Sequence, residues 1–545
     1  MARCSQEDDG GTSQRMEVLL NRYGRATVGV VGLGPTGASF TWHVLQEFTA
    51  HPCSRLLRIT MIEPSAKLGM GYAFRSRHRL NMRADTISID PDRPAHFAQW
   101  LRRNSNSSCQ DQPDYPPRSQ FGKYVAQMLS DAIAAASASD LDIEHWRASA
   151  IDIERVGKSF RVTGNDGDTR DFEILVLALG ESHYGALSSY RGASRFIASP
   201  WLTAQFEDIP SSARIAIAGT SLSAVDACLQ LLGQGHQGLI TCLSRTRGFP
   251  KVQGAPEYYQ PRVMTKSWLR ETTASGRTQI GLHTVAAALR KELDHTMGTP
   301  YEPGATDPRE WFSVKGLRVR RKRPANEIFN DAVLSAETSH TRWYYTLDSL
   351  SPIIPHIWNY IDARDQAHFL RRYRASWNEY RHSMPMANAL ALLPAAVAGQ
   401  LIIQPGLRSV APSTSQDAAK WNVVTSSGDH EGSYDFLIDA TGGQSAIACQ
   451  RDPLLQACRR RGLVKVDPRG GVRVVFDNCQ VIDARGEACE NLYFLGPLTF
   501  GTHFYTNSFE TNRNNAYHAA RDIERILQGK RPRPSCQPAG HQISL

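Results

Sequence analysis

The sequence predicts an α/β fold with two similar strand–turn–helix units and a mainly helical region. Each unit starts with a short apolar strand pattern, passes through a turn of small residues and continues as a helix, at 26–45 and 214–227. The region from Gly248 to Gln404 holds helical patterns, among them 282–293, 369–380 and 387–397. Together these patterns indicate two Rossmann-like dinucleotide-binding domains with a mainly helical substrate region.

Composition agrees with a globular protein of two or three structural units. The chain has 545 residues, 41% hydrophobic and 21% charged. It lacks an apolar run of about 18 residues, so we expect no membrane span. Residues 1–25 are too polar for an export signal and are predicted to be a flexible leader, and residues 530–545 a flexible tail. The ten cysteines form no CxxC pair and no zinc-like spacing, which favours reduced thiols in the cytoplasm and no metal site.

The net charge of +9 first raises the question of nucleic-acid binding. The basic residues are scattered apart from a run at 318–323, and no aromatic recognition module accompanies that run. Anionic small ligands explain the surplus better, so we expect no nucleic-acid partner. The pattern leaves homo-oligomer formation open.

The first turn is the strongest motif in the chain. The strand 26–31 leads into G-L-G-P-T-G and then a helix, which is the context that a dinucleotide fingerprint requires. Gly32 permits the tight turn, Gly34 lets the backbone approach a pyrophosphate, and Gly37 lets helix and strand pack closely. The candidate phosphate-binding residues are therefore Gly32, Gly34, Pro35, Thr36 and Gly37, at a helix N-terminus that attracts anions.

A second strand, 57–62, ends in Glu63. An acidic residue at this tip is where ribose hydroxyls are bound in such domains. The spacing from the glycines is longer than the usual ~20 residues, and a longer first helix with its following loop can absorb the difference.

The second turn departs from the strict fingerprint. After the strand 214–218 come Gly219 and a helix, but Ser221 and Ala224 stand where the second and third glycines would be. Both are small, so a ligand backbone approach stays feasible, and Gly219, Ser221 and Ser223 are the candidate contacts. The alternative is a Rossmann-like unit retained for packing only.

The next strand, 239–243, points to the choice of coenzyme. It is followed by Arg245 and Arg247 where an NAD enzyme would carry an acidic residue. A guanidinium matches the oxygens of a 2′-phosphate, which favours NADPH. Either arginine could instead be a solvated loop charge.

Several segments resemble one known family. These are the run GMGYAF…HRLNM from Gly69 to Met82, the segments 97–101 and 117–124, and the block 371–385. They are similar to FAD/NAD(P)-binding proteins related to the N-hydroxylating flavin monooxygenases, such as the ornithine and lysine N-hydroxylases and the aspartate N-oxygenases that form nitrosuccinate. The resemblance implies FAD in the first domain, with Gly71, Asn81 and Met82 near the flavin.

The resemblance also bears on the C-terminal part. The run D-A-T-G, with Thr441 and Gly442, is similar to the motif with which the chain returns to the FAD domain. Pro497 stands where many flavoproteins carry an Asp that holds the ribityl chain, so that contact is not carried over. His503, Asn507 and Glu510 are candidates for the flavin edge, or they simply cap a helix from about residue 512 to 527.

For the substrate, the block 371–385 offers Arg381 and His382. Arginine binds planar carboxylates through two donors, although a helix with arginines on its wet face is the simpler interpretation. No nucleophile elbow, HExxH motif or metal-ligand cluster occurs in the sequence, and flavin oxygenation needs none because the cofactor carries the chemistry.

The leading hypothesis is an NADPH-dependent monooxygenase. NADPH reduces FAD, O2 gives a flavin C4a-hydroperoxide, and an oxygen atom passes to an amine, as implied by the N-hydroxylating relatives. The alternatives are a flavin reductase or dehydrogenase with another acceptor, and a non-catalytic flavin-scaffold protein. The predicted domains are 26–185 with 405–529 for FAD, 186–250 for the NADPH core, and 251–404 for the helical substrate region with parts of the NADPH domain.

Overall fold

The computed structural model describes residues 25–51, 56–104, 114–137, 141–180, 185–246, 248–255, 257–297, 309, 323–338, 341–413, 420–426, 432–443 and 452–530. The predicted leader up to residue 24, the tail after residue 530, Arg247 and the basic run before Arg323 lie outside these ranges.

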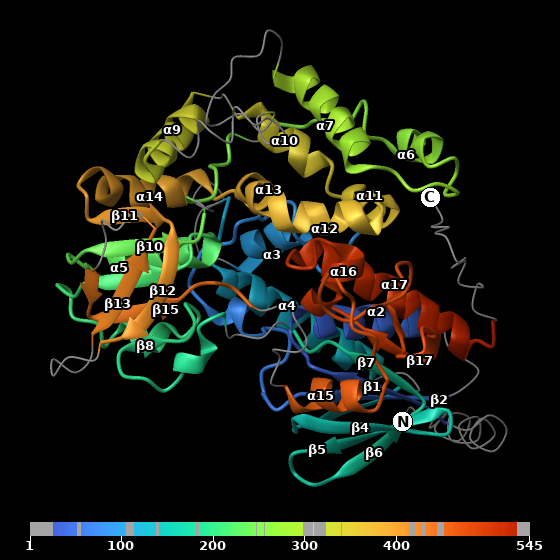
Figure 1. The fold of residues 1–545 in the computed structure, drawn as a ribbon. Helices are drawn as coiled ribbons and strands as arrows, with labels where there is room; N and C mark the ends of the chain where they lie inside the picture. Colours follow the sequence, from blue (N-terminus) through green and yellow to red (C-terminus); the bar gives the residue numbers. More distant parts are fainter. Residues whose placement is uncertain are drawn as a thin grey trace, which may run out of the picture. The chain divides into compact units, whose positions relative to one another are not determined.

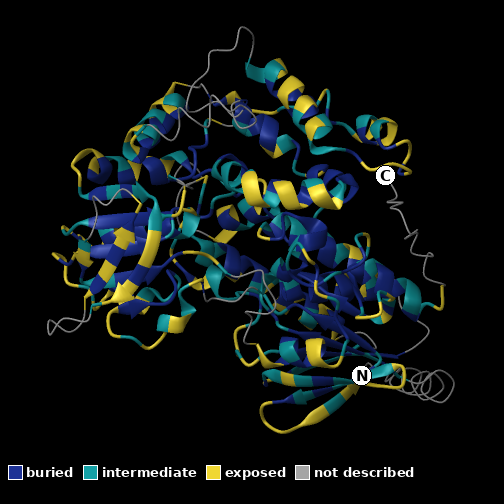
Figure 2. Cartoon of the chain, viewed as in Figure 1, coloured by how far each residue is buried: buried dark blue, intermediate teal, exposed yellow. Residues whose placement is uncertain are grey.

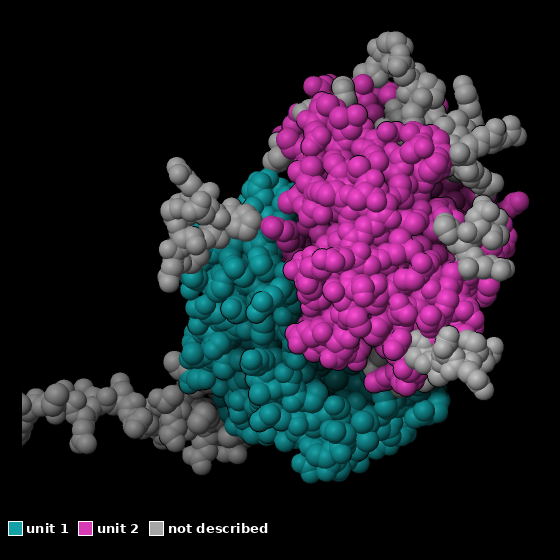
Figure 3. Space-filling view, turned by 90° about the vertical axis from the view of Figure 1, so that its left-hand side faces the viewer, with its two compact units in different colours: residues 1–77, 83–181, 445–536 teal, residues 78–82, 182–444, 537–545 magenta. Residues whose placement is uncertain are grey.

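The chain divides into two compact units (Figure 3). Unit 1 comprises residues 1–77, 83–181 and 445–536, and unit 2 comprises residues 78–82, 182–444 and 537–545. The chain thus returns to unit 1 at residue 445 and not at 405, because the strands between these positions pair within unit 2. The short segment 78–82 also groups with unit 2.

Unit 1 is built on a six-stranded sheet in the order β16-β17-β7-β1-β2-β3, in which β16 is the antiparallel edge strand (Figure 1). Its strands are β1 (Arg25–Val31), β2 (Leu56–Ile62), β3 (Leu141–Trp146), β7 (Ile174–Leu177), β16 (Gln480–Ile482) and β17 (Ala488–Phe494). The central strands β1, β2 and β7 are almost entirely buried, as near-continuous apolar runs predict for parallel strands.

Helices α2 and α17 pack side by side, and α2 also contacts α4. The helices of unit 1 are α2 (Pro35–Ala50), α3 (His96–Asn104), α4 (Arg118–Ala136), α15 (Pro453–Arg460), α16 (Phe500–His503) and α17 (Phe509–Leu527). The predicted first helix and the predicted helix near the C-terminus are α2 and α17, each a few residues longer than its apolar pattern.

A small antiparallel sheet in unit 1 was not predicted from the sequence. It consists of β4 (Ala150–Val156), β5 (Ser159–Gly164) and β6 (Thr169–Phe172). Alternate residues Phe160 and Val162 of β5 are buried and share a hydrophobic cluster with Leu454 and Leu455 of α15. This sheet therefore buries one face and leaves the other in solvent, as its mixed colours in Figure 2 show.

Unit 2 contains a parallel five-stranded sheet in the order β11-β10-β9-β15-β8. Its strands are β8 (Phe196–Ile197), β9 (Ile215–Ala218), β10 (Ile240–Ser244), β11 (Leu401–Pro405) and β15 (Phe436–Asp439). An antiparallel sheet of β12 (Leu407–Pro412), β13 (Trp421–Thr425) and β14 (Gly432–Tyr434) precedes β15. The predicted nucleotide-binding unit therefore includes strands from three separate stretches of sequence.

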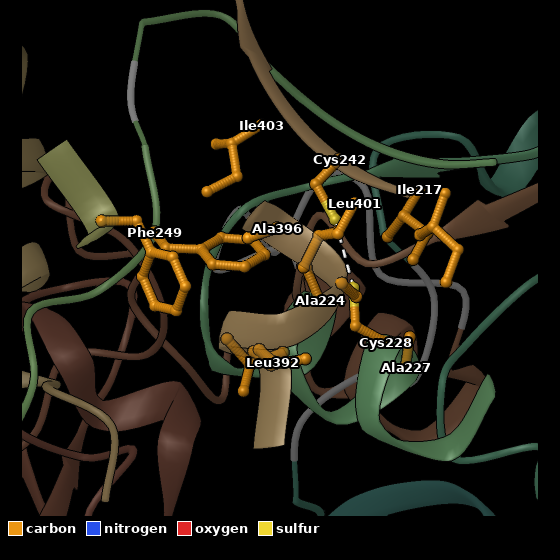
Figure 4. Close-up of a cluster of buried hydrophobic side chains, with 14 of the residues drawn as sticks. Ile217, Ala224, Ala227, Cys228, Cys242, Phe249, Leu392, Ala396, Leu401 and Ile403 are labelled. Carbon is orange, nitrogen blue, oxygen red and sulfur yellow. Dashed lines mark hydrogen bonds between the residues drawn. The ribbon is translucent and has the colours of Figure 1, made fainter. Parts of the chain in front are cut away.

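The core of unit 2 joins α5 (Leu222–Gly233) and α14 (Met386–Val397) to this sheet. Figure 4 shows Leu392 and Ala396 of α14 near Ala224 and Cys228 of α5. The thiols of Cys228 and Cys242 lie 3.3 Å apart within this apolar cluster. Burial raises the pKa of Cys242 well above its ordinary value, so Cys242 stays a neutral thiol in the core.

The region between β10 and β11 is mainly helical in its described part, as predicted. It contains α6 (Lys266–Thr272), α7 (Leu282–Met297), α9 (Ala325–Glu337), α10 (Arg342–Ser349), α11 (Ile354–Tyr360), α12 (Ala363–Arg372), α13 (Arg374–Arg381) and α14. The predicted single helix at 369–380 is wrong, because the helix breaks at Tyr373, whose φ is −114°. Across the described residues, no helix combines the length and apolar character needed to cross a bilayer.

A buried histidine in unit 1 gives a pH-dependent prediction. His43 on α2 is 4% exposed, and burial lowers its pKa to about 3, with Arg513 and His518 adding to the effect and Asp90 opposing it. Native His43 therefore stays neutral while the unfolded chain takes up a proton below about pH 6.5. The unfolded state then binds more protons, so stability is lost as the pH falls, by about 2 kcal/mol between pH 7 and 5.

We expect His43→Phe to remove this part of the acid sensitivity. Urea unfolding of the wild type and of the variant at pH 7.5 and pH 5.0 measures this loss of stability. The difference between the two proteins reports on His43, because the other groups titrate alike in both. An equal loss of stability in variant and wild type would contradict the assignment.

Candidate functional site

The predicted glycine turn lies at the carboxyl end of β1. Gly32 has φ +87°, and a Cβ placed there would lie 2.4 Å from the carbonyl oxygen of Ala178. At Gly37 a Cβ would lie 1.9 Å from the carbonyl oxygen of Gly32. The protein itself therefore requires glycine at both positions, for the turn and for the close packing of α2 against it.

Gly34 differs from its two neighbours. Its backbone is extended, with φ −66° and ψ −175°, and a Cβ there would meet only the Cα of Gly71, at 3.6 Å. The fold does not demand glycine here. A ligand that passes close to the backbone requires glycine at this position. The open surface at the start of the 16-residue helix α2 therefore fits a pyrophosphate. Pro35 and Thr36 form the first turn of that helix.

Glu63 lies beside this turn, just beyond the end of β2. Its carboxylate accepts hydrogen bonds from the N–H of Leu33 (3.0 Å) and of Ser65 (3.1 Å). Each carboxylate oxygen can accept a further bond, so the geometry is compatible with the predicted ribose contact. Glu63 also fixes the glycine turn through Leu33.

The glycine-rich segment after β2 packs directly on the turn. Gly71 has φ +55°, and a Cβ there would lie 2.6 Å from Cδ of Pro35. The N–H of Gly69 donates to the carbonyl of Leu33 (2.8 Å). The structure thus brings Gly71 next to Gly34 and Pro35, as a shared ligand site requires.

Asn81 and Met82 belong to the segment that groups with unit 2. The carbonyl of Asn81 accepts a hydrogen bond from Nε2 of Gln253 (3.0 Å). In the same segment His78 contacts Oε1 of Gln230 on α5 (3.1 Å) and the ring of Trp201. Asn81, one of the two predicted flavin contacts, is therefore held by a residue of unit 2.

The second turn repeats the geometry of the first. Gly219 has φ +137°, and a Cβ there would lie 2.2 Å from the carbonyl oxygen of Ala440. Ser221 is the N-cap of α5 with φ −84° and ψ −174°, close to the values at Gly34. Its side chain makes no cap hydrogen bond, and Ser223 lies in the first turn. The start of α5 therefore fits a second phosphate, and Ala224 requires a slightly wider turn than Gly37.

Arg245 lies at the edge where such a phosphate would bind. Leu243 of β10 pairs with Ala218 of β9, so Arg245 and Gly219 follow adjacent strand ends. Arg245 is exposed. This arrangement suits a guanidinium that binds a 2′-phosphate.

Arg245→Ala removes a charge-assisted contact worth roughly 1.5–3 kcal/mol. We expect the KM for NADPH to rise by about an order of magnitude or more, with little change for NADH. Steady-state kinetics with both coenzymes measures this, with Arg408→Ala, at an exposed arginine on β12, as a matched control. Equal weakening of both coenzymes would place Arg245 at the shared pyrophosphate.

The D-A-T-G motif holds the chain where it enters unit 2. The hydroxyl of Thr441 donates to Asp439 (2.6 Å) and accepts from the N–H of Ala186 (2.7 Å). Asp439 also accepts from the N–H of Leu187 (3.0 Å), and burial raises its pKa. Thr441 therefore has a clear structural role, whereas Gly442 (φ +80°) is open to solvent. The contact of Thr441 and Gly442 with a cofactor stays a prediction.

The C-terminal candidates His503 and Asn507 differ in their burial. His503 is 2% exposed, and its ring nitrogens lie 3.1 Å from Oγ1 of Thr499 and 2.9 Å from the carbonyl of Phe476. This packing favours a structural role over the predicted contact with the flavin edge. Asn507 is exposed in the loop before α17, and the carbonyl of Pro497 accepts from Oγ1 of Thr506 (2.8 Å).

Arg381 ends α13 and has partners from the segment around α10. Its Nη2 donates to Oγ of Ser351 (2.5 Å) and lies 3.5 Å from a carboxylate oxygen of Asp348. His382 is the C-cap of the same helix. The predicted substrate arginine thus belongs to an internal ion pair, which a carboxylate ligand would join.

One buried carboxylate of the helical region was not predicted from the sequence. Buried Glu292 of α7 accepts from the hydroxyl of Tyr259 and from the N–H groups of Arg262, Val263 and Met264. Burial alone would raise the pKa of Glu292, but these donors lower it overall. Because the donors precede it by 28–33 residues, no local pattern indicates this clamp. It fixes the segment that precedes α6.

Comparison with known proteins gives a match in the N-terminal part of the chain. Residues 29–182 match a family model described as FAD-NAD(P)-binding. No curated protein sequence matches the chain.

Solved structures resemble nearly the whole chain. The reduced ornithine hydroxylase of Pseudomonas aeruginosa has a TM-score of 0.54 at 13% identity, covering 93% of this chain and 99% of that one. An ornithine N-hydroxylase of Kutzneria sp. 744 gives 0.52 at 13%, with 92% and 99% covered, and its structure holds reduced FAD, NADP+ and L-ornithine. L-lysine 6-monooxygenase of Pseudomonas syringae gives 0.52 at 15%, with 92% and 99% covered. The predicted fold, that of the N-hydroxylating flavin monooxygenases, is confirmed.

Proposed function

We propose that this protein is an FAD- and NADPH-dependent monooxygenase that N-hydroxylates an amino acid or a related amine. The observation that carries the proposal is the fold likeness to an ornithine hydroxylase over 93% of the chain. The open glycine at Gly34, which the fold itself does not need, supports a dinucleotide in unit 1. The matching N-cap geometry at Ser221 supports a second one in unit 2.

Different residues bind FAD and NADPH in this proposal. The start of α2, from Gly34 to Gly37, holds the FAD pyrophosphate through backbone N–H groups, and Glu63 binds ribose hydroxyls. The start of α5, with Ser221, holds the pyrophosphate of NADPH. When bound, NADPH supplies a hydride and reduced FAD supplies the activation of O2.

For the substrate, we place its carboxylate at Arg381. A guanidinium carries five N–H donors, so a contact of Nη2 with Ser351 is compatible with a carboxylate bound along another edge. Asp348 then orients the guanidinium while its negative charge disfavours a doubly anionic ligand. This favours a substrate with one carboxylate and an amine over a dicarboxylate.

The proposal is tested with FAD-loaded protein and a panel of amino acids and diamines. NADPH consumption, peroxide release and hydroxylamine product are measured on the same samples. We expect one compound class to stimulate NADPH consumption and to replace peroxide with product. Peroxide release that no amine suppresses would contradict N-hydroxylation, and NADPH oxidation coupled only to an artificial electron acceptor would favour a reductase.

A further inference from the structure

Gln253 makes an unusual set of contacts in unit 2. Its side chain is 3% exposed, and its Nε2 donates to two main-chain carbonyls, those of Asn81 (3.0 Å) and Ser383 (2.9 Å). Both hydrogens of the carboxamide are therefore used inside the protein. The backbone holds Gln253 in place as well, since its N–H donates to the carbonyl of Met384 (2.9 Å).

The opposite end of this carboxamide is unsatisfied. Oε1 of Gln253 and Oγ of Ser383, whose side chain is 1% exposed, are buried without a hydrogen-bond partner among the described residues. A buried polar atom without a partner costs roughly 1–3 kcal/mol, and native proteins rarely leave one so. Because Gln253 cannot rotate without losing two hydrogen bonds, its acceptor is fixed and calls for an external donor.

The surroundings restrict the chemistry of that donor. Lys251, two residues before Gln253, is 2% exposed, and its ammonium lies 5.5 Å from the centre of the Tyr380 ring. A buried positive charge so near in sequence disfavours a cationic ligand such as an ammonium group. A neutral N–H donor fits the site better, and a carboxamide offers both N–H donors for Gln253 and a carbonyl for the Ser383 hydroxyl.

The chain itself links this site to the coenzyme. The loop that leaves β10 begins at Arg245, where the 2′-phosphate is placed, and reaches Gln253 eight residues later. Eight residues span at most about 26–29 Å when extended. Gln253 then donates to the carbonyl of Asn81. The loop thus connects the strand end where the 2′-phosphate is placed to the carboxamide of Gln253.

We infer that Oε1 of Gln253 and Oγ of Ser383 bind the carboxamide of the nicotinamide ring. The inference rests on the proposed use of NADPH. Gln253 has a second task in this arrangement, because the same side chain fixes Asn81 through its carbonyl. The residue therefore aligns the coenzyme with the segment 78–82.

Equilibrium binding tests the inference without catalysis. NADP+ and its 3-acetylpyridine analogue, in which a methyl ketone replaces the carboxamide, are titrated calorimetrically into the FAD-loaded protein. We expect the wild type to bind NADP+ about fivefold more tightly, the effect of losing one neutral hydrogen bond. Gln253→Met is expected to weaken the binding of NADP+ and to leave that of the analogue almost unchanged. Ser383→Ala is expected to weaken the binding of both, because the methyl ketone keeps the carbonyl that the Ser383 hydroxyl binds.

Ser383→Ala keeps the test valid if Gln253→Met misfolds, since the hydroxyl has no hydrogen-bond partner among the described residues. Gln366→Met, at another buried glutamine of unit 2, is the matched control and is expected to keep the preference for NADP+. Equal binding of both coenzymes by the wild type, or unchanged binding of both by Ser383→Ala, would overturn the inference and assign the two oxygens to a buried water. Failure of the wild type to bind either coenzyme would instead refute the proposed function.

Discussion

Gly34→Val is expected to yield a folded protein that purifies without FAD. The backbone at Gly34 lies in a region that valine adopts readily, and a Cβ there meets only Gly71 Cα at 3.6 Å. The protein therefore accommodates the start of a side chain, which occupies the space that the pyrophosphate needs. Flavin absorbance per protein and circular dichroism on the same preparation measure the two effects.

Two neighbouring substitutions separate ligand loss from misfolding. Gly37→Ala puts a Cβ 1.9 Å from the Gly32 oxygen, so that variant is expected to lose folded protein and flavin together. Gly34→Ala adds the Cβ alone and is expected to weaken FAD binding without unfolding. A Gly34→Val protein that retains a full complement of FAD would show that the pyrophosphate lies elsewhere.

Arg381→Ala is expected to uncouple NADPH oxidation from product formation. Without the guanidinium the substrate amine is no longer held within reach of the activated oxygen, and loss of positioning lowers rates by orders of magnitude. FAD content is expected to stay near wild type, while product falls steeply and peroxide rises. Arg381→Lys is expected to restore only part of the product formation, because an ammonium cannot reproduce the two-donor geometry.

Asp348→Ala is the control variant, because Asp348 forms an ion pair with Arg381. If Arg381 serves only to pair with Asp348 and Ser351, both alanine variants lower stability and flavin content in the same way. If Arg381 binds substrate, Asp348→Ala preserves most of the product formation, because Ser351 still holds the guanidinium in place. Intact product formation by Arg381→Ala would end the carboxylate hypothesis at this position.

The sequence predicted those parts of the fold whose causes are local. β1, β2, β9 and β10 follow from buried apolar runs, and the two ligand turns follow from residues that must be small. Gly32 and Gly37 could be assigned because each meets a backbone oxygen of the turn or of the adjacent strand end.

Long-range contacts explain what the sequence did not reveal. His503 looked like a flavin-edge residue, but the carbonyl of Phe476, 27 residues earlier, engages its ring. The sheet β12–β14 consists of short strands with alternating burial, which the sequence does not distinguish from loops around β15. The fixed carboxamide of Gln253 likewise depends on Asn81, 172 residues away.

The most direct test of the central claim is an anaerobic titration of the purified protein with NADPH, followed at the flavin absorbance band. Two dinucleotide sites on one chain predict a yellow protein whose band bleaches with one equivalent of NADPH, more readily than with NADH, and returns when O2 is admitted. A colourless protein that stays colourless after incubation with FAD, or bound flavin that NADPH fails to bleach, would contradict the account.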